Sequence, residues 1–139
     1  MKIILGINAY HADSSACILV DGKLIAAIEE ERINRIKHYS GYPIESIREC
    51  LKIAELKEDD VTDIAFNTKP NSNLLPKIFF FAKNFSIKDN NLTKKIKKKT
   101  NIHHPLMKNF TLNKKIKFHF IEHHLAHLAS AYYPSKFKK

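Results

Sequence analysis

The sequence predicts an α/β domain in which helices pack on a mixed β-sheet. Three short apolar segments, at residues 2–8, 16–20 and 23–28, have the length and composition of β-strands. A segment with helical periodicity follows at residues 43–56, and a further strand pattern occupies residues 61–67. The order of three strands, a helix and a strand favours helices packed on a mixed sheet.

The first strand and the hairpin are predicted from apolar runs and one turn. Residues 2–8 form a short run rich in isoleucine, which is typical of a buried strand. Asp21-Gly22 separates the next two apolar runs and is a strong signal for a two-residue hairpin turn. The strands at 16–20 and 23–28 should therefore pair with each other.

The helix and the fourth strand are predicted from residue spacing. Pro43 suits the first turn of a helix, where its missing N–H group is not needed. Apolar side chains then recur at three- and four-residue spacings, at Ile44, Ile47, Leu51 and Ala54. Residues 61–67 alternate in side-chain character, so we expect a strand there.

The second half of the chain gives weaker structural signals. Between residues 69 and 113 we expect a helix over Leu74 to Ala82, then a mobile, lysine- and asparagine-rich insertion with room for a short second helix. Residues 116–121 alternate as a strand does, and residues 122–132 contain several alanines that favour a helix. Pro134 should end that helix.

The composition fits one ordinary globular domain. A chain of 139 residues with 44% hydrophobic content can bury a core. Cys17 and Cys50 lie singly in apolar segments, so we expect small core residues in a reducing compartment rather than a disulfide framework. We find no run of about 18 apolar residues, which excludes the usual membrane span, and we expect the cytoplasm as the location.

The net charge of +10 is unevenly distributed along the chain. Most of the excess lies between Lys69 and Lys117, where the one acidic residue is Asp89. This segment has no arginine, the side chain that binds phosphates and bases through two parallel hydrogen bonds. A solvated lysine-rich surface is therefore favoured over a nucleic-acid site.

The strongest chemical signal is a pair of histidines at a predicted strand-to-helix junction. Residues four apart lie on the same face of a helix, so His123 and His127 can bind one divalent ion. A complete site needs one or two further ligands, usually carboxylates. The alternative is that His123, His124 and His127 are polar residues that cap a helix and face solvent. The junction lies at the carboxyl edge of a sheet, where α/β folds place ligands, which favours the metal site.

A second candidate site is the polar loop between the first two strands. Hydroxyl and backbone N–H groups around Ser14 and Ser15 can hold phosphate oxygens, and Asp13 can hold a metal or a water molecule. His11 is suited to proton transfer. An ordinary turn would account for the Asp and Ser residues but not for His11.

The charged segment at residues 29–38 is a third candidate. Arg32, Arg35 and Lys37 can project toward a phosphate or carboxylate ligand, or the segment can be a solvated surface of weak ion pairs. Residue spacing alone leaves both interpretations open.

Two blocks of sequence resemble a known family. Residues 4–8, 11–16, 20–22 and 29–38 (ILGIN, HADSSA, VDG and EEERINRIKH) resemble the start of the carbamoyltransferase family that includes nodulation protein U and antibiotic O-carbamoyltransferases. Residues 118–135 (FHFIEHHLAHLASAYYPS) resemble the histidine motif of that family. The blocks occur in the expected order and bracket nearly the whole chain, while residues 69–113 match only loosely.

The resemblance implies a fold and a reaction. Residues 1–139 would be the N-terminal part of an actin-like ATPase fold, with 69–113 as a variable insertion. His123 and His127 would bind iron or another divalent metal. A further domain of the family is thought to make carbamoyl adenylate from carbamoyl phosphate and ATP, and the actin-like domain then passes the carbamoyl group to a hydroxyl of a small molecule.

The same resemblance suggests roles for the polar loop. His11 would take the proton from the attacking hydroxyl. Asp13, Ser14 and Ser15 would position the nucleotide or the acceptor, and Lys37 would steady the carbamoyl or phosphate group.

Family enzymes are several times longer than this chain. We therefore expect a fragment or the product of a split or degraded gene, without carbamoyltransferase activity when isolated. A separate chain that carries the missing C-terminal part is a candidate partner. Two alternatives stay open: a basic RNA-associated module that uses Lys94 to Lys99, and a relative of the enzymes that transfer threonylcarbamoyl groups to tRNA. Residues 29–31 and 129–135 favour the small-molecule branch over the tRNA branch.

Overall fold

A computed structural model describes residues 1–69, 101–133 and 135 of the chain. The elements in chain order are β1 (Ile3–Asn8), β2 (Ser15–Val20), β3 (Lys23–Glu29), α1 (Glu31–Asn34), α2 (Ile44–Ile53), the 3-10 helix η1 (Glu58–Asp60), β4 (Asp63–Phe66), α5 (His104–Asn109), β5 (Lys117–Phe120) and α6 (His123–Tyr132). None of the described helices is long and apolar enough to cross a membrane.

The described strands form one mixed sheet in the order β3-β2-β1-β4-β5. β2 runs antiparallel to both of its neighbours, whereas β1, β4 and β5 run parallel to one another. The predicted α/β class, with a mixed sheet and flanking helices, is confirmed. The predicted hairpin at Asp21-Gly22 is also present.

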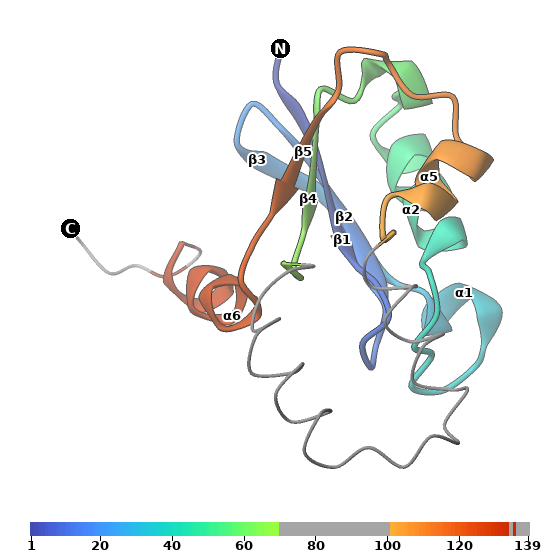
Figure 1. Cartoon of the computed structure of the whole chain (residues 1–139), viewed down its shortest axis with the longest axis vertical. Coiled ribbons are helices and arrows are strands. Elements are labelled where there is room, and N and C mark those ends of the chain that lie inside the picture. Colours follow the sequence, from blue (N-terminus) through green and yellow to red (C-terminus); the bar gives the residue numbers. More distant parts are fainter. Residues whose placement is uncertain (70–100, 134, 136–139) are drawn as a thin grey trace, which may run out of the picture.

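The core lies on one face of the sheet. Ile3, Leu5 and Ile7 of β1 are buried because alternate side chains of a strand point to the same face. α2 and α5 cover this face (Figure 1) and contribute buried side chains to the same core, including Ile47 and Leu106.

Stacked aromatic rings join the last two strands of the sheet. Phe66 of β4 lies with its ring centroid 6.5 Å from that of Phe118 and 5.6 Å from that of Phe120, both of β5. Phe66 is fully buried, and these contacts fix β5 beside β4. The strand that leads into the histidine motif is thus anchored in the core.

α2 begins where a buried carboxylate meets its first turn. Glu30 is only 3% exposed, and its two carboxylate oxygens accept hydrogen bonds from the backbone N–H groups of Ser46 at 2.7 Å and Glu45 at 3.2 Å. Such groups at a helix start have no partner within the helix, so Glu30 caps α2. The observed helix is shorter than the predicted 43–56 at both ends.

Two short helices were not placed by sequence periodicity. α1 occupies the charged segment at 29–38, and α5 lies in the C-terminal part of the predicted insertion at 69–113. Ile102 and Leu106 are fully buried, so this part belongs to the core. The helix predicted over Leu74 to Ala82 lies outside the described residues.

The two cysteines differ in burial. Cys50 is buried in the core, as predicted, whereas Cys17 is half-buried on the opposite face of the sheet. Both thiols are free, and burial raises the pKa of each.

Candidate active site

Three parallel strands end at the same edge of the sheet. β1 ends at Asn8, β4 at Phe66 and β5 at Phe120. The polar loop at 9–14, the segment at 67–69 and α6 follow these ends directly. Carboxyl ends of neighbouring parallel strands are where α/β sheets place ligands, so the candidate residues gather at the expected edge.

α6 begins with a capped first turn that presents the histidines. Oε2 of Glu122 accepts a hydrogen bond from the backbone N–H of Leu125 at 2.9 Å, and Oε1 lies 3.0 Å from Nδ1 of His124. The Leu125 N–H group, followed by His124, holds the pKa of Glu122 below its usual range. These two contacts of Glu122 fix the first turn of α6. His124 is paired with Glu122, whereas His123 and His127 lie on the neighbouring face of the helix.

His123 and His127 face each other through their Nε2 atoms, which lie 3.1 Å apart. Two bare lone pairs at this distance repel, so either one ring donates its Nε2–H to Nε2 of the other, or a cation lies between the two nitrogens. With metal–nitrogen bonds of about 2.1 Å, two imidazole nitrogens on one ion lie about 3.0 Å apart at a right angle and about 3.4 Å at the tetrahedral angle. The observed spacing falls between these values, so the pair fits a divalent ion.

Metal-binding histidines usually donate their second ring N–H to an acceptor, yet Nδ1 of His123 is buried and has no hydrogen-bond partner among the described residues. Within the same residues, the group of three possible ligand atoms within 4.8 Å of one another belongs to Asp13, Glu31 and His38. Among the described residues, no such group of three includes His123 or His127.

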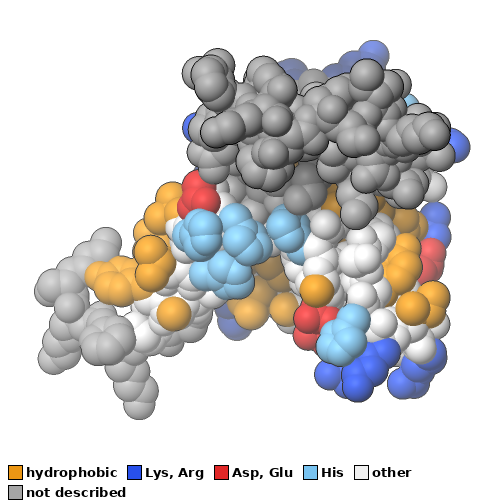
Figure 2. Space-filling view, turned by 60° about the horizontal axis from the view of Figure 1, so that its bottom comes forward, with side chains coloured by type: hydrophobic (Ala, Val, Ile, Leu, Met, Phe, Trp, Pro, Cys, Tyr) orange, Lys and Arg blue, Asp and Glu red, His pale blue; other side chains and the backbone are white. Residues whose placement is uncertain are grey.

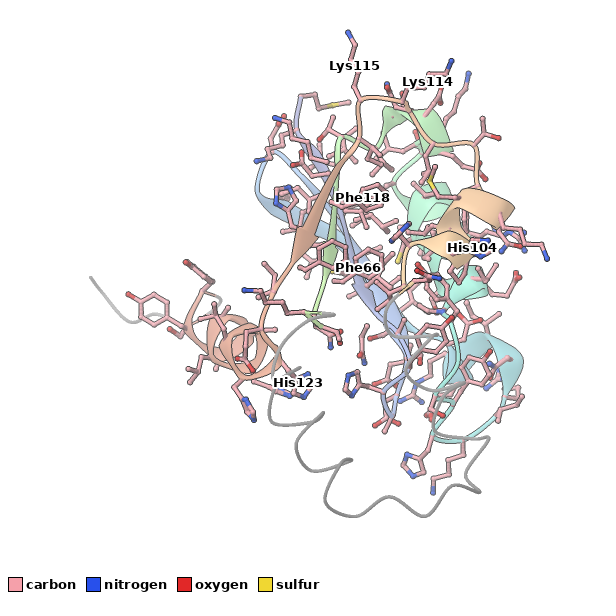
Figure 3. All side chains as sticks on the ribbon, in the orientation of Figure 1. Phe66, His104, Lys114, Lys115, Phe118 and His123 are labelled. Carbon is pink, nitrogen blue, oxygen red and sulfur yellow. The ribbon has the colours of Figure 1, made fainter. Side chains whose placement is uncertain are left out.

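His11 completes what we call the histidine cluster, His11, His123 and His127. Its ring stacks on that of His123, with centroids 4.8 Å apart and planes inclined by 16°. Its Nε2 lies 3.1 Å from Oγ1 of Thr68, in the segment that follows β4. Figure 2 shows a surface patch of several histidine side chains, with another histidine apart from it, and Figure 3 shows His123 at the start of α6.

The remaining candidates of the polar loop are placed differently. Oδ1 of the exposed Asp13 lies 3.0 Å from Nδ1 of His38, and this hydrogen bond raises the pKa of His38. Ser15 is the first residue of β2. Lys37 is exposed beside His38, and no described contact joins it to the histidine cluster.

Ser14 ties the polar loop to the segment before α2. It is 1% exposed, its hydroxyl donates to the carbonyl oxygen of Gly41 at 2.8 Å, and its backbone N–H donates to that of Tyr39 at 2.9 Å. Its own carbonyl accepts a hydrogen bond from the N–H of Glu30. In the described structure Ser14 therefore fixes the loop that carries His11.

Sequence reasoning missed the contribution of the segment after β4. The side chain of Asn8 makes two hydrogen bonds. Its Nδ2 donates to the carbonyl of Asp13, and its Oδ1 accepts from Nδ2 of Asn67 at 2.8 Å. Thr68 contacts His11 next to this pair. The signal that could have indicated these residues is their position, since polar residues directly follow a strand that is parallel to β1.

A small cavity lies on the face of the sheet that carries Cys17. Its volume is about 260 Å³, and its lining includes Gly6, Cys17, Ala65, Ile121 and Ala126. Small side chains on three strands leave this space next to the first turns of α6.

Comparison with known proteins places the chain among carbamoyltransferase sequences. The family described as "Carbamoyltransferase N-terminus" matches residues 3–139. The uncharacterized protein sll1178 of Synechocystis is 35% identical over 147 residues, which cover 99% of this chain and 24% of that protein. Nodulation protein NolNO of Sinorhizobium fredii is 44% identical over 59 residues, which cover 42% of this chain and 9% of that protein.

The comparison with solved structures includes one weak similarity. YeaZ from Pseudomonas aeruginosa is similar over 98% of this chain and 51% of its own, at 14% identity and a TM-score of 0.46. The chain spans about a quarter of the length of sll1178 and smaller parts of NolNO.

Proposed function

The chain belongs to the family of carbamoyltransferase N-termini. We propose that it supplies part of the active centre of an O-carbamoyltransferase. The proposed reaction moves a carbamoyl group, supplied by carbamoyl phosphate and ATP through carbamoyl adenylate, to a hydroxyl of a small molecule. The observation that carries this proposal is the histidine cluster, which joins the two sequence blocks of the family at one edge of the sheet.

We propose that His123 and His127 hold a divalent metal, for which iron is the first candidate. The 3.1 Å separation of their Nε2 atoms supports this role. When bound, such an ion would neutralise negative charge on phosphate oxygens. Glu122 assists from the helix start by fixing the first turn of α6.

His11 is the proposed general base. Its ring stacks on His123, so a hydroxyl placed beside the metal pair would also lie within reach of an imidazole nitrogen. The hydroxyl proton would move to His11 as the hydroxyl oxygen attacks the carbamoyl carbon, and the adenylate phosphate would leave with the electron pair of the broken bond.

Asp13, Ser15 and Lys37 are proposed to position the nucleotide or the acceptor from the other side of the polar loop. Ser14, which the sequence placed in the same group, would contribute by holding the loop through its buried hydroxyl. The exposed positions of Asp13 and Lys37 leave both side chains accessible to a ligand.

The remaining parts of the reaction are proposed to come from elsewhere. This chain spans about a quarter of the length of sll1178, so adenylate formation and the other metal ligands would belong to a longer protein or a second chain. We accordingly expect no turnover of carbamoyl phosphate and ATP by the 139-residue chain alone.

Metal binding tests the proposal without requiring turnover. Titration of the purified chain with Co²⁺, followed by absorbance, should show uptake that His127→Ala weakens at least tenfold, since removing one of two ligands leaves a single imidazole. His124→Ala is the matched control, because it removes a histidine from the same turn that pairs with Glu122 instead. Equal uptake by both variants would refute the metal pair.

Activity tests the reaction itself. The family assignment predicts carbamoyl transfer when the chain is combined with the missing part of a relative such as sll1178, and His11→Ala should then lower the rate. Turnover by the 139-residue chain alone, absent from His127→Ala, would overturn the proposal that this chain is only part of the centre.

The alternative of an RNA-associated module gains no support from the described residues. Its lysines, Lys94 to Lys99, lie outside them. Salt-sensitive RNA binding that disappears when these lysines are neutralised would favour that alternative.

A further inference from the structure

α6 carries a line of exposed apolar side chains along one face. Leu125, Leu128 and Tyr132 follow one another at spacings of three and four residues, which places them on the same side of the helix. Their exposed fractions are 56%, 68% and 42%, and hydrophobic side chains lie at the surface beside the histidine patch in Figure 2. His123 and Ala126, which are half-buried, lie on a different face. We call Leu125, Leu128 and Tyr132 the α6 stripe.

A helix of this length needs such a face to be packed. α6 has ten residues, and none of them is buried. Isolated helices of this length are marginal in water, and helices in proteins gain most of their stability by packing an apolar face. The Glu122 cap and the stacking of His123 on His11 hold the first turn. The later turns of α6 therefore need an occupant on the α6 stripe.

The sheet offers further apolar surface next to α6. The cavity of about 260 Å³ on the face that carries Cys17 is lined by Ala126 of α6 together with side chains of β1, β2 and β4. α2 and α5 lie on the other face of the sheet (Figure 1). An occupant that packs on the α6 stripe therefore has room for an apolar side chain in this cavity.

We propose that the α6 stripe is the docking surface for the part of the longer relatives that this chain does not match, and that this part presents an apolar segment to it. The inference deepens the proposed function and rests on it, because that function assigns the missing parts of the centre to a longer protein or a second chain. The region aligned with this chain covers 24% of sll1178, so most of that protein is available for this role.

The size of the α6 stripe favours this occupant over a second copy of the chain. Stable complexes of separate proteins usually bury about 800 Å² on each partner, from roughly 20 residues or more. Three side chains of one helix are a small part of such an interface. A segment of the same polypeptide avoids most of the loss of translational and rotational freedom that association costs. In a relative that carries both parts in one chain, a small apolar face is therefore sufficient.

Nuclear magnetic resonance of the ¹⁵N-labelled 139-residue chain tests this docking. The probe is the remainder of sll1178, produced without the region that aligns with this chain. Its addition should shift the amide signals of α6 and slow their hydrogen exchange at least about tenfold, because a packed helix opens less often than an uncovered one. Leu128→Glu should weaken the binding at least about tenfold, because it would bury a carboxylate against apolar surface.

Met107→Glu is the matched control. Met107 of α5 is 58% exposed, and α5 covers the core face of the sheet, away from α6 (Figure 1). This variant introduces the same charge at a similarly exposed apolar side chain, so it should bind as the unaltered chain does. Leu125→Glu is a second variant of the α6 stripe and should behave as Leu128→Glu does. Circular dichroism checks that each variant keeps its fold.

A chimera serves where the remainder of sll1178 does not fold by itself. Residues 1–139 then replace the aligned region of sll1178, and α6 amides should exchange at least about tenfold more slowly in the chimera than in the isolated chain. Leu128→Glu should remove this protection, whereas Met107→Glu should keep it. Equal exchange in the chimera and the isolated chain, or protection that Leu128→Glu leaves unchanged, would overturn the inference.

Two other occupants have distinct signatures. Self-association of the chain in light scattering that Leu128→Glu abolishes would assign the α6 stripe to a second copy. Binding to anionic phospholipid vesicles that the same variant abolishes would assign it to a lipid surface. Either result would overturn the inference.

The Co²⁺ titration distinguishes this inference from the proposed function. Leu128 lies on a different face of α6 from His123 and His127, so Co²⁺ uptake by Leu128→Glu should stay within about twofold of that by the unaltered chain. Docking without Co²⁺ uptake by the unaltered chain would count against the metal pair of the proposed function. Co²⁺ uptake without docking would overturn the role of the α6 stripe.

Discussion

Replacing Ser14 by alanine should lower the free energy of unfolding by about 2 kcal/mol relative to replacing Ser46 by alanine. Both serines are almost fully buried, at 1% and 0% exposure. They differ in what their hydroxyl groups do. The Ser14 hydroxyl donates to Gly41 and lies 3.2 Å from the carbonyl oxygen of His11, whereas that of Ser46 has no partner among the described residues.

The magnitude follows from these contacts. Removing the Ser14 hydroxyl breaks its hydrogen bond to the carbonyl oxygen of Gly41, which keeps the N–H of Tyr10 as a donor, and the loss of this one bond costs about 1.5 kcal/mol. Alanine at position 46 removes an unsatisfied hydroxyl from α2 and has the higher helix propensity, so Ser46→Ala should gain about 0.5 kcal/mol. At an unfolding entropy of about 2 cal/mol/K per residue, the difference corresponds to about 7 °C in Tm for 139 residues.

Thermal and urea unfolding of the two variants measure this difference. Ser14→Thr, which keeps the hydroxyl, should recover part of the loss if its extra methyl group is accommodated. Equal Tm values for Ser14→Ala and Ser46→Ala would refute the reasoning, because the two substitutions remove the same atoms from equally buried positions.

Three further changes test other parts of the structure. Gly6→Ala should destabilise the sheet by about 1–3 kcal/mol, because the new Cβ atom would lie 2.6 Å from Sγ of Cys17; Cys17→Ala in the same chain should restore most of the loss in urea unfolding. The hydrogen bond from His119, followed by that from Thr62, holds the pKa of Asp63 below its usual range. The stability that Asp63→Asn removes should therefore be present above about pH 4 and be lost as the pH falls through the depressed pKa, whereas a penalty independent of pH would contradict this. Glu122→Ala should lower helix content by circular dichroism because it removes the cap of α6, and unchanged helicity would count against that cap.

The strands and the longer helices could be predicted because their signals are local. The alternation in 61–67 and the Asp21-Gly22 turn need no knowledge of distant residues, and the observed strands agree with them to within a few residues. α1 and α5 could not be predicted in the same way. α5 depends on burying Leu106 against a sheet that forms from other parts of the chain.

The same distinction between local and distant contacts applies to the candidate site. The spacing of His123 and His127 could be read from the sequence because both lie on one helix. The contact of His11 with Thr68 required the parallel pairing of β1 with β4, which periodicity does not specify. The burial of Ser14 likewise depends on a segment that lies 27 residues away in the sequence.

Crystallography of the chain soaked with a divalent metal tests the central claim most directly. Anomalous scattering should place one ion about 2.1 Å from Nε2 of both His123 and His127. The position should be empty in His127→Ala crystals and occupied in His124→Ala crystals. An ion bound only by the group of Asp13, Glu31 and His38, or no ion at the histidine pair, would contradict the account.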